Sequence, residues 1–250
     1  RRCADDDPHV GKTAGRPHAT ATTIGGIRLD AATVRLGDAQ VLAPLTLDLD
    51  ARTIAVVGDN GSGKSTLARL IGGLVRPTGG TVRVLGCDPV RDAAELRRRV
   101  AIVFSNPDAQ IVMPTVAEDV AFSLRGDGAS RAERAARVGR ALERFGLTDL
   151  RDHPAHELSG GQKQLLALCG AFVREPELVV ADEPTAFLDG RNAARIAGHL
   201  FSDTGHRLLL VTHDLDLARR CELAVHVAAG RVVAAGGASE VVDAYARTWR

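Results

Sequence analysis

The sequence lacks any apolar run long enough to cross a bilayer, and its N-terminus lacks the apolar core of a signal peptide. It also lacks an excess of charge of either sign. The 32 Lys and Arg residues are balanced by 31 Asp and Glu residues, so the formal net charge of +1 gives no field that would steer the chain onto nucleic acid or an anionic membrane. We therefore expect a chain that is soluble by itself and binds no nucleic acid.

Cysteine and lysine are both scarce. The four cysteines, at positions 3, 87, 169 and 221, have neither the spacing of metal ligands nor the density of a disulfide scaffold, and a reducing cytosol fits this usage best. Only three lysines occur, Lys12, Lys64 and Lys163. With so few, a lysine inside a motif is harder to dismiss as incidental.

The composition indicates a globular chain. With 45% hydrophobic and 25% charged residues, 250 residues are enough for one large α/β core or two small domains. Residues 1–23 contain three consecutive aspartates, two prolines and almost no branched apolar side chains, so we expect a disordered tail there. We expect residues 24–250 to form a single folded domain.

The folded part begins with strands. Between residues 24 and 50, apolar residues alternate with polar ones, which predicts antiparallel strands broken around Gly37 and Asp38 and again at Pro44. Further on, apolar runs alternate with helical patterns, which predicts a mostly parallel sheet covered by helices on both faces. The expected strands lie near residues 53–57, 81–85, 100–104, 178–181, 207–212, 224–227 and 231–235, and the expected helices near 67–71, 92–99, 191–201 and 215–220.

The middle of the folded part has helical patterns with no strand between them. Thr115 with Glu118 and Ser130 with Glu133 have the spacing of capping boxes, each opening a helix. We therefore expect residues 106–170 to be a helical subdomain inserted into the α/β core. The second helix has an apolar stripe at positions i, i+4 and i+7 on an otherwise arginine-rich surface: Val138, Leu142 and Phe145.

A glycine-rich loop joins a predicted strand to a predicted helix. Residues 58–66 are GDNGSGKST, which lays the pattern G-x-x-x-x-G-K-S between the apolar run 53–57 and the helical pattern that starts at Leu67. Small residues let backbone N–H groups curl around a phosphate, and the following helix turns its positive end toward it. Lys64 can then reach the β and γ phosphates, while the Ser65 hydroxyl can bind Mg²⁺. The alternative is a turn that uses its glycines only for bending.

A second pair of glycines opens another helix. Residues 158–164 are LSGGQKQ, in which Ser159 and two glycines precede an apolar helical pattern that ends before Pro176. Unpaired N–H groups beside a serine at a helix N-terminus make an anion site. An ordinary N-cap followed by flexible glycines explains these residues equally well when they are taken alone.

Two adjacent carboxylates end the apolar run 178–181. Because side chains alternate along a strand, Asp182 and Glu183 must point differently. At the carboxyl edge of a parallel sheet, one can bind Mg²⁺ and the other can accept a proton from an attacking water. The alternative is a solvated strand end before Pro184.

Two further polar residues belong to the same edge of the predicted sheet. His213 follows the apolar strand 207–212, where it could contact a γ-phosphate. A lone histidine is, however, usually a surface or core residue without a functional role. Asp189 ends the short segment after Pro184 and could equally cap a helix.

These stretches, in this order, resemble the ATPase subunits of ABC transporters. The resemblance spans about residues 27–240 and rests on GDNGSGKST, LSGGQKQ, LVVADEP at 178–184, AFLD at 186–189 and THD at 212–214. It implies a RecA-like P-loop core with a mostly parallel sheet, an antiparallel β edge and a helical subdomain. It also implies a dimer with a second ATPase subunit, either an identical copy or a paralogue, with each ATP between one P-loop and the partner's LSGGQ segment.

The resemblance implies a role for each matched residue. ATP and Mg²⁺ would be the cofactors, Glu183, His213 and Lys64 the catalytic residues, and Ser65 and Asp182 the metal ligands. Asp189 would report across the dimer interface. The residues that bind the nucleotide or complete its site would be Gly58, Asp59, Asn60, Gly61, Ser62, Gly63, Lys64, Ser65, Thr66, Ser159, Gly160, Gly161, Gln162 and Asp189.

A narrower resemblance covers residues 103–122. The segments VFSNPDAQIV at 103–112 and TVAEDVAF at 115–122 are similar to the ATPases of energy-coupling-factor importers, which serve vitamins, cobalt and nickel. The form here looks most like the biotin-transport ATP-binding subunits. This resemblance implies a transmembrane coupling subunit and a substrate-binding membrane subunit as partners, and a peripheral position at the cytoplasmic face of the cell membrane.

Two positions depart from the family's pattern. Ser105 stands where the family usually has a glutamine that touches Mg²⁺ and water and links the site to the membrane partner. Gln110 matches a second glutamine of the subgroup and is not assumed to replace the first. The stretch around Leu36 also lacks the aromatic residue that usually stacks on adenine, so we expect weaker selectivity for the base.

Two other functions stay open on the sequence. A non-transport ABC ATPase acting on nucleic acid or ribosomes would share the motifs, but the single cassette, the lack of long coiled-coil heptads and the near-neutral charge oppose it. A regulatory nucleotide-binding module without turnover would be compatible with Ser105. The intact Lys64, Asp182, Glu183 and His213 favour an enzyme.

Overall fold

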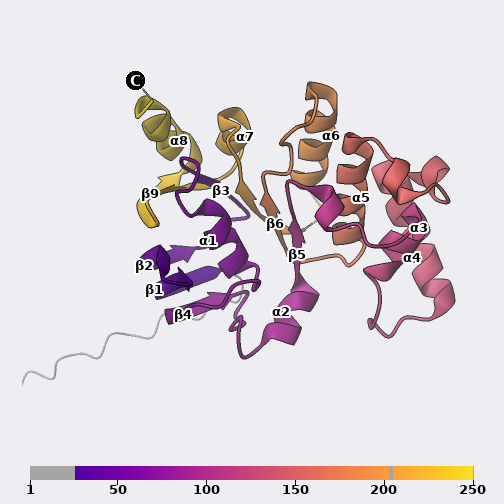
Figure 1. Ribbon diagram of the computed structural model, residues 1–250, viewed down its shortest axis with the longest axis horizontal. Helices are drawn as coiled ribbons and strands as arrows, with labels where there is room; N and C mark the ends of the chain where they lie inside the picture. Colours follow the sequence, from indigo (N-terminus) through magenta and orange to yellow (C-terminus); the bar gives the residue numbers. More distant parts are fainter. Residues whose placement is uncertain (1–25, 203–204, 250) are drawn as a thin grey trace, which may run out of the picture.

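Two β-sheets and the helices that cover them make up the molecule (Figure 1). The computed structural model describes residues 26–202 and 205–249, so the expected disordered tail at 1–23 lies outside the described residues. The smaller sheet has the strand order β2-β1-β4, and the larger has the order β5-β6-β7-β3-β8-β9. The strands are β1 (Ile27–Leu36), β2 (Ala39–Leu49), β3 (Thr53–Val57), β4 (Gly79–Val84), β5 (Val100–Val103), β6 (Leu178–Asp182), β7 (Arg207–Val211), β8 (Leu223–Ala228) and β9 (Arg231–Gly237).

The larger sheet is parallel except at one edge. Strands β5, β6, β7, β3 and β8 run parallel to one another, and β9 pairs antiparallel with β8. The smaller sheet is antiparallel throughout. The predicted α/β class, with a mostly parallel sheet and a separate antiparallel edge, is confirmed.

Helices cover both faces of the larger sheet. The helices of the described residues are α1 (Lys64–Ile71), α2 (Ala93–Arg99), α3 (Val116–Phe122), α4 (Arg131–Phe145), α5 (Gly160–Phe172), α6 (Gly190–Leu200), α7 (Leu215–Arg219) and α8 (Ala238–Arg247), of which α3 and α4 pack on α5 rather than on the sheet. Along the described ranges, 26–202 and 205–249, no helix is both long and apolar enough to span a membrane.

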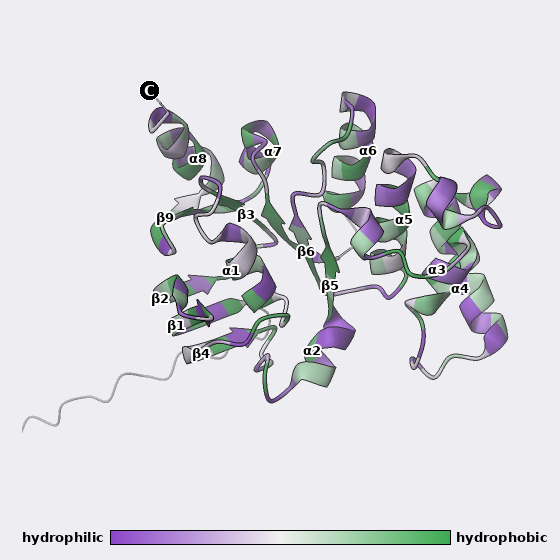
Figure 2. Cartoon of the chain, viewed as in Figure 1, coloured by the Kyte–Doolittle hydropathy of each residue, from purple (hydrophilic) through white to green (hydrophobic). Residues whose placement is uncertain are grey.

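The parallel strands are apolar without interruption because both of their faces are buried. In β3, Ile54 and Val56 belong to the hydrophobic core shared with α1 and the smaller sheet, whereas Ala55 and Val57 belong to the core shared with α3 to α8. Figure 2 shows these central strands as hydrophobic along most of their length. Because successive side chains of a strand point to opposite faces, each central strand contributes alternate residues to the two cores.

Residues 104–177 contain helices and no strand. Both predicted capping boxes are confirmed, because Thr115 caps α3 with Glu118 and Ser130 caps α4 with Glu133. Three short 3₁₀ turns lie beside the α-helices, at Pro107–Ala109, Thr148–Leu150 and Ala155–Glu157. The predicted stripe on α4 is buried as expected: Val138, Leu142 and Phe145.

The expected break at Pro44 is wrong, since β2 continues through it. β2 is the outer strand of the smaller sheet, and Pro44 lies between Leu42 and Leu45, where the register with β1 shifts. An edge strand tolerates a residue without an N–H group, especially at such an irregularity. The other expected break, at Gly37 and Asp38, is the turn between β1 and β2.

Two helices differ from the expectation at the sequence level. Helix α1 begins at Lys64 rather than Leu67, directly after Gly63 as its N-cap. Helix α8 was not expected at all, although its buried residues have the i, i+3, i+4, i+7 spacing of an amphipathic helix. These residues are Ala238, Val241, Val242 and Tyr245.

The topology brings three strand ends together. β3 pairs with β7, β7 pairs with β6, and all three run in one direction. Their carboxyl ends therefore meet at one edge of the sheet, where ligands usually bind in open α/β sheets. The glycine-rich loop that starts at Gly58 follows β3. Asp182 ends β6 and Glu183 follows it, and His213 lies just after β7.

Candidate active site

The loop between β3 and α1 requires glycine at two places. At Gly58, φ is +145°, and a Cβ atom would lie 2.0 Å from the carbonyl oxygen of Val227. At Gly63, φ is +106°, and a Cβ atom would lie 2.8 Å from Cδ2 of Leu42. Glycine avoids both clashes and lets the loop lead directly into the N-terminus of α1, where free N–H groups and the helix dipole favour an anion.

Lys64 is folded back onto this loop. Its ammonium group donates to the carbonyl oxygens of Gly58 and Asp59, each at 2.7 Å, and the residue is only 5% exposed. Burial lowers the pKa of Lys64, while the carboxylates of Glu183, Asp182 and Asp59 act in the opposite direction. A cation held this way, at the start of a helix, is placed to offset the charge of a phosphate that enters the loop.

Ser65 and Asp182 come together across the strand ends. The Ser65 hydroxyl donates to Oδ1 of Asp182 at 3.0 Å, and Asp182 is 7% exposed. A hydroxyl and a carboxylate supply the oxygen ligands that Mg²⁺ prefers, and Mg²⁺ usually takes only one or two protein ligands besides phosphates. No group of three or more His, Cys, Asp and Glu side chains in the described part of the chain could hold a metal. The residues present therefore fit a magnesium ion shared with a phosphate, not a metal cage.

Glu183 stands beside this pair with an unusual backbone and an unusual pKa. Its φ is +52°, and its N–H donates to the carbonyl of Val211 at 2.9 Å, which fixes it at the strand edge. Burial raises the pKa of Glu183 to about 7, although the backbone N–H of His213 and the charge of Lys64 act in the opposite direction. Its Oε1 is buried and accepts no hydrogen bond from any described residue. That oxygen makes no hydrogen bond that would compete with a proton, although the imidazole of His213 lies 3.2 Å away.

His213 faces the same carboxylate. Its backbone N–H donates to Oε2 of Glu183 at 3.3 Å, and its Nε2 lies 3.2 Å from Oε1. Burial, followed by the charge of Lys64, lowers the pKa of His213 below its ordinary 6.5. At neutral pH the imidazole is therefore mostly uncharged, and we treat its contact with Glu183 as a polar contact rather than an ion pair.

Lys64, Ser65, Glu183 and His213 line a cleft of about 290 Å³, whereas Asp182, Gly58 and Asp59 are not among its lining residues. The Ser62 hydroxyl within it is buried and has no hydrogen-bond partner among the described residues, as expected for a group that awaits a ligand. Leu36 is absent from the lining, and Val41 is a member that the sequence did not predict. The lining residues are Val41, Asn60, Gly61, Ser62, Gly63, Lys64, Ser65, Thr66, Glu183 and His213.

Comparison with known protein families decides the affiliation. The family model for the ABC transporter matches residues 42–186, more than half of the 250 residues. This chain belongs to the ABC transporter ATPase family. The resemblance noted for GDNGSGKST and LSGGQKQ is confirmed, and ATP is the nucleotide of this enzyme.

Individual relatives of this ABC ATPase carry more specific names. The biotin transport ATP-binding protein BioM of Rhizobium etli is 40% identical over 219 residues, which cover 88% of this chain and 97% of BioM. The nickel import ATP-binding protein NikO of Rhodobacter capsulatus is 42% identical over 212 residues, which cover 79% of this chain and 83% of NikO. Among solved structures, cbiO1 of Clostridium perfringens, part of the ABC transporter complex cbiONQ, has a TM-score of 0.78 at 31% identity, over 87% of this chain and 90% of cbiO1.

Residues 159–162 of the LSGGQ segment, which we call the signature, lie at the start of α5. Ser159 is the N-cap of α5, and its backbone N–H donates to Oε1 of Gln162 at 2.8 Å, completing a capping box. A Cβ atom on Gly160 would meet no heavy atom within 4 Å, so this end of the helix is open. None of the four residues 159–162 lines the cleft. The P-loop and the signature of one chain therefore do not form a single site.

Asp189 lies next to the signature of its own chain. It is the N-cap of α6, and its carboxylate accepts the backbone N–H of Asn192 at 2.9 Å and the side-chain amide at 2.7 Å. The Asn192 side chain packs so closely on Gly161 that a Cβ atom there would lie 2.6 Å away. Asp189 is thus both a helix cap and, through Asn192, a neighbour of the signature.

Ser105 and Gln110, the two positions compared above with the family's glutamine, both lie outside the cleft. Gln110 is engaged elsewhere, because its side chain accepts the N–H of Phe104 at 2.8 Å and donates to the carbonyl of Ile102 at 2.9 Å. It braces the end of β5 and does not replace the missing glutamine. Gln164 of α5 also donates to the carbonyl of Phe104, at 3.1 Å, a contact that the sequence did not predict.

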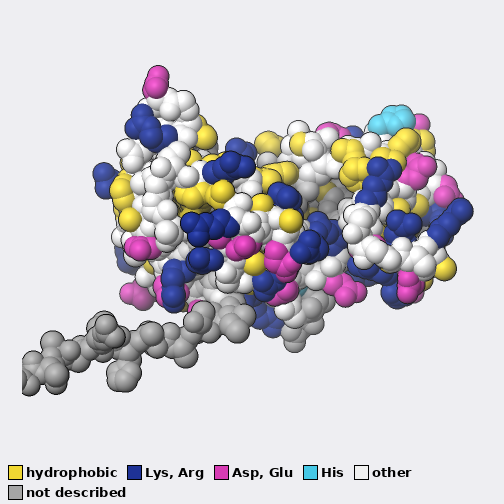
Figure 3. Space-filling view, turned by 90° about the horizontal axis from the view of Figure 1, so that it is seen from below, with side chains coloured by type: hydrophobic (Ala, Val, Ile, Leu, Met, Phe, Trp, Pro, Cys, Tyr) yellow, Lys and Arg dark blue, Asp and Glu magenta, His cyan; other side chains and the backbone are white. Residues whose placement is uncertain are grey.

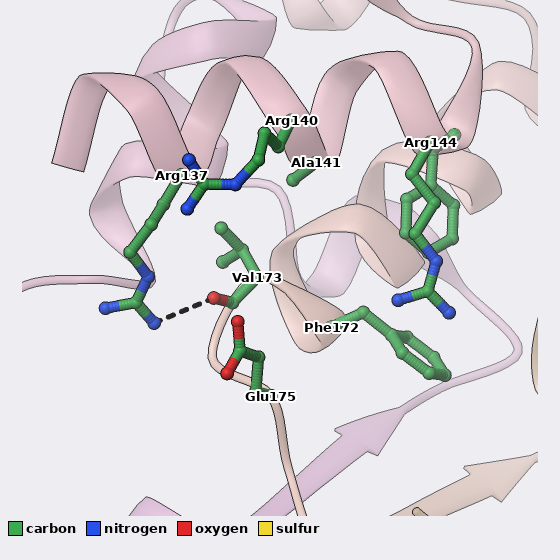
Figure 4. Close-up of a pocket in the computed structure, with 8 residues that line it drawn as sticks. Arg137, Arg140, Ala141, Arg144, Phe172, Val173 and Glu175 are labelled. Carbon is green, nitrogen blue, oxygen red and sulfur yellow. Dashed lines mark hydrogen bonds between the residues drawn. The ribbon is translucent and has the colours of Figure 1, made fainter. Parts of the chain in front are cut away.

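A second hollow, between α4 and the end of α5, contains no motif residue (Figure 4). Arg137 donates to the carbonyl of Val173 there at 2.9 Å, and the guanidinium of Arg144 stacks on the ring of Phe172. Glu175 lies on the same wall with a positive φ of 53°. Lys64 and the carboxylates of the sheet edge are absent from it, so it has none of the residues that the sequence motifs connect with ATP.

Proposed function

We propose that this ABC ATPase powers an importer of the energy-coupling-factor type, working with a transmembrane coupling subunit and a substrate-binding membrane subunit at the cytoplasmic face of the membrane. The carrying observation is the cleft at the ends of β3, β6 and β7, in which Lys64, Glu183 and His213 line a P-loop whose Ser65 is bonded to Asp182. The resemblance of residues 103–122 to energy-coupling-factor ATPases and the names of the relatives support the type of transporter.

In this proposal the P-loop and the Ser65–Asp182 pair bind MgATP. The N–H groups at the start of α1 meet the phosphates, and Lys64 turns from the carbonyls of Gly58 and Asp59 to the β and γ phosphates. Ser65 and Asp182 hold Mg²⁺, which offsets phosphate charge when it is bound. The residues that position the nucleotide are thus rigidly tied to one sheet edge.

Glu183 is the general base of the proposed reaction. Its buried Oε1 accepts a proton from the attacking water, and a pKa near 7 keeps a useful fraction of it ionised at neutral pH. The half-exposed imidazole of His213, 3.2 Å from that oxygen, holds the γ-phosphate. Both side chains reach the cleft from strand ends, which fixes their positions relative to the P-loop.

The proposed enzyme works as a dimer with a second copy or a paralogue. Residues 159–162 present the open N-terminus of α5 but lie outside the cleft of their own chain. If two chains meet head to tail, the N-terminus of α5 in one chain would lie on the γ-phosphate bound to its partner. Closure around ATP and opening after hydrolysis would then move the membrane subunits.

Biotin is the favoured cargo, because the segment at 103–122 is most similar to biotin-transport subunits and BioM aligns over 97% of its own length. A transition-metal ion such as nickel is the alternative, since NikO is as similar in identity. In either case a separate membrane subunit would select the cargo.

An uptake experiment tests the proposal. The chain would be produced with the candidate coupling and substrate-binding subunits in cells without biotin or nickel uptake of their own, and labelled biotin and Ni²⁺ would be offered. We expect uptake of one cargo, lost when Lys64→Ala replaces the parent chain. The matched control is Lys163→Ala, which removes a lysine paired with Asp108 outside the cleft and should keep ATP binding. Uptake of neither cargo, with the chain absent from the membrane fraction, would contradict an importer.

Catalysis should depend on pH through Glu183. A base with a raised pKa of about 7 is mostly protonated at pH 6 and mostly ionised at pH 8, so kcat should rise about tenfold between these values. The pKa of His213 is lowered by burial, so its titration does not produce a rise between pH 7 and 8. The measurement is kcat at saturating MgATP from pH 6 to 8. A profile that is flat over this interval would exclude Glu183 as the titrating base.

A clamp on nucleic acid or ribosomes is the weaker candidate. The longest helix between the P-loop and the signature, α4, has 15 residues, so the described chain has no long coiled-coil arm. On the face that Figure 3 shows, Lys and Arg side chains are interspersed with Asp and Glu rather than gathered into one basic patch. Stimulation of the ATPase by RNA or DNA at physiological salt, without membrane subunits, would favour this candidate instead.

A further inference from the structure

The C-terminal helix α8 carries the chain's single tyrosine, and the single tryptophan follows it. Its buried face packs against β8, β9 and β3, which places the helix behind the strand that leads into the P-loop. Tyr245 is only 3% exposed. A tyrosine buried this deeply needs a hydrogen-bond partner for its hydroxyl.

That partner is a P-loop residue, Asp59. The Tyr245 hydroxyl donates to Oδ1 of Asp59 at 2.9 Å, although the two residues are 186 positions apart in the sequence. The ring contacts two other rings, with the His226 ring centroid at 4.6 Å and the Trp249 centroid at 5.2 Å in an edge-on arrangement. The hydroxyl is therefore presented from a fixed position rather than from a flexible side chain.

Asp59 is the residue on which the first turn of the P-loop depends. Its carbonyl oxygen accepts the ammonium group of Lys64 at 2.7 Å and the backbone N–H of Ser62 at 3.2 Å. When Lys64 turns toward phosphate, one of these bonds is lost and the loop has less to hold it. A hydrogen bond to the Asp59 side chain does not depend on Lys64, so it can keep the turn in place.

From this geometry we infer that Tyr245 is a positioning residue for the nucleotide. It holds Asp59 so that the P-loop keeps the shape that receives phosphate, and the affinity for ATP thereby depends on the docking of α8. The inference rests on the proposed phosphate-binding role of the P-loop. Because bound phosphate itself holds the loop once it is present, the hydroxyl affects capture of ATP rather than the chemical step.

The variant Tyr245→Phe tests this role with the smallest possible change. It keeps the ring contacts with His226 and Trp249 and removes only the hydroxyl. We expect the Kd and KM for ATP to rise about fivefold, the loss of one hydrogen bond, while kcat at saturating ATP stays near the parental value. The thermal unfolding midpoint should stay close to the parental value, which would show that α8 is still docked.

Four further variants make the test specific. Asp59→Ala should weaken ATP binding, and adding Tyr245→Phe to it should weaken binding no further, because both remove the same bond. Asp59→Asn keeps an acceptor oxygen and should restore most of the affinity. Asp243→Ala is the matched control on α8, since it removes the contact with Arg219 without touching the P-loop and should leave the Kd unchanged.

The outcomes separate this inference from the assignment of the P-loop. An unchanged Kd in Tyr245→Phe, beside lost binding in Lys64→Ala, would overturn the role of Tyr245 alone. Additive losses in the Asp59→Ala, Tyr245→Phe pair would also overturn it. Retained binding in Lys64→Ala would overturn the P-loop assignment and, with it, the role of Tyr245.

Discussion

Replacing Glu183 with Gln is expected to lower kcat by a factor on the order of 10² or more and to leave ATP bound in a dimer that does not open. The amide has the shape of the carboxylate. Its oxygen can still accept the backbone N–H of His213, which in the parent chain donates to Oε2 of Glu183 at 3.3 Å. It cannot take a proton from water. Binding should therefore survive while the chemical step fails.

The measurement combines ATPase rates with size-exclusion chromatography in MgATP. Glu175→Gln is the matched control, because Glu175 also has a left-handed backbone, with φ of 53° against 52° at Glu183, but lies exposed beside the hollow between α4 and α5. It should turn over ATP at the parental rate. If Glu183→Gln hydrolyses ATP as fast as the parent, Glu183 is not the base.

Local signals in the sequence predicted local structure well. The capping boxes at Thr115 and Ser130 involve residues three apart, so the sequence alone contains both partners. The strand ends at Asp182 and His213 followed from apolar runs that only a doubly buried parallel strand explains. From the same signals we predicted that the P-loop, Asp182, Glu183 and His213 lie at one edge of the sheet.

Features that depend on distant partners could not be predicted in this way. The break expected at Pro44 failed because an edge position in a sheet is a property of the whole topology, not of the residue. The raised pKa of Glu183 comes first from burial, which no spacing reveals. The bond between Tyr245 and Asp59 joins residues 186 positions apart. Helix α8 itself was predictable, since its apolar spacing is regular.

One part of the proposed site, the signature at residues 159–162, lies outside the cleft of its own chain. The sequence places the P-loop and the signature in one chain, and the structure shows that residues 159–162 do not line the cleft that Lys64 and Glu183 line. A helix N-terminus with an open approach at Gly160 is suited to an anion. The proposed dimer explains why such an end is exposed on an enzyme whose own phosphate site is elsewhere.

Ser159→Arg is therefore expected to abolish ATP-dependent dimerisation and the ATPase activity that requires it, while ATP binding at the chain's own P-loop stays unchanged. The long cation would occupy the approach to the α5 N-terminus, where the partner's phosphate must lie. The change also removes an N-cap, at a cost of about 1 kcal/mol in stability. Ser130→Arg removes the equivalent cap from α4, so it controls for that cost and should still dimerise.

Mixing two inactive variants tests whether the site is shared between chains. In a heterodimer of Ser159→Arg and Lys64→Ala, one composite site combines the intact P-loop of the first chain with the intact signature of the second, and the other site carries both changes. With random pairing, half of the dimers are heterodimers with one good site in two, so up to about a quarter of the parental activity should return. A site built within one chain would recover nothing on mixing. Dimerisation of Ser159→Arg with ATP, or failure of the mixture to regain any activity, would contradict the shared site.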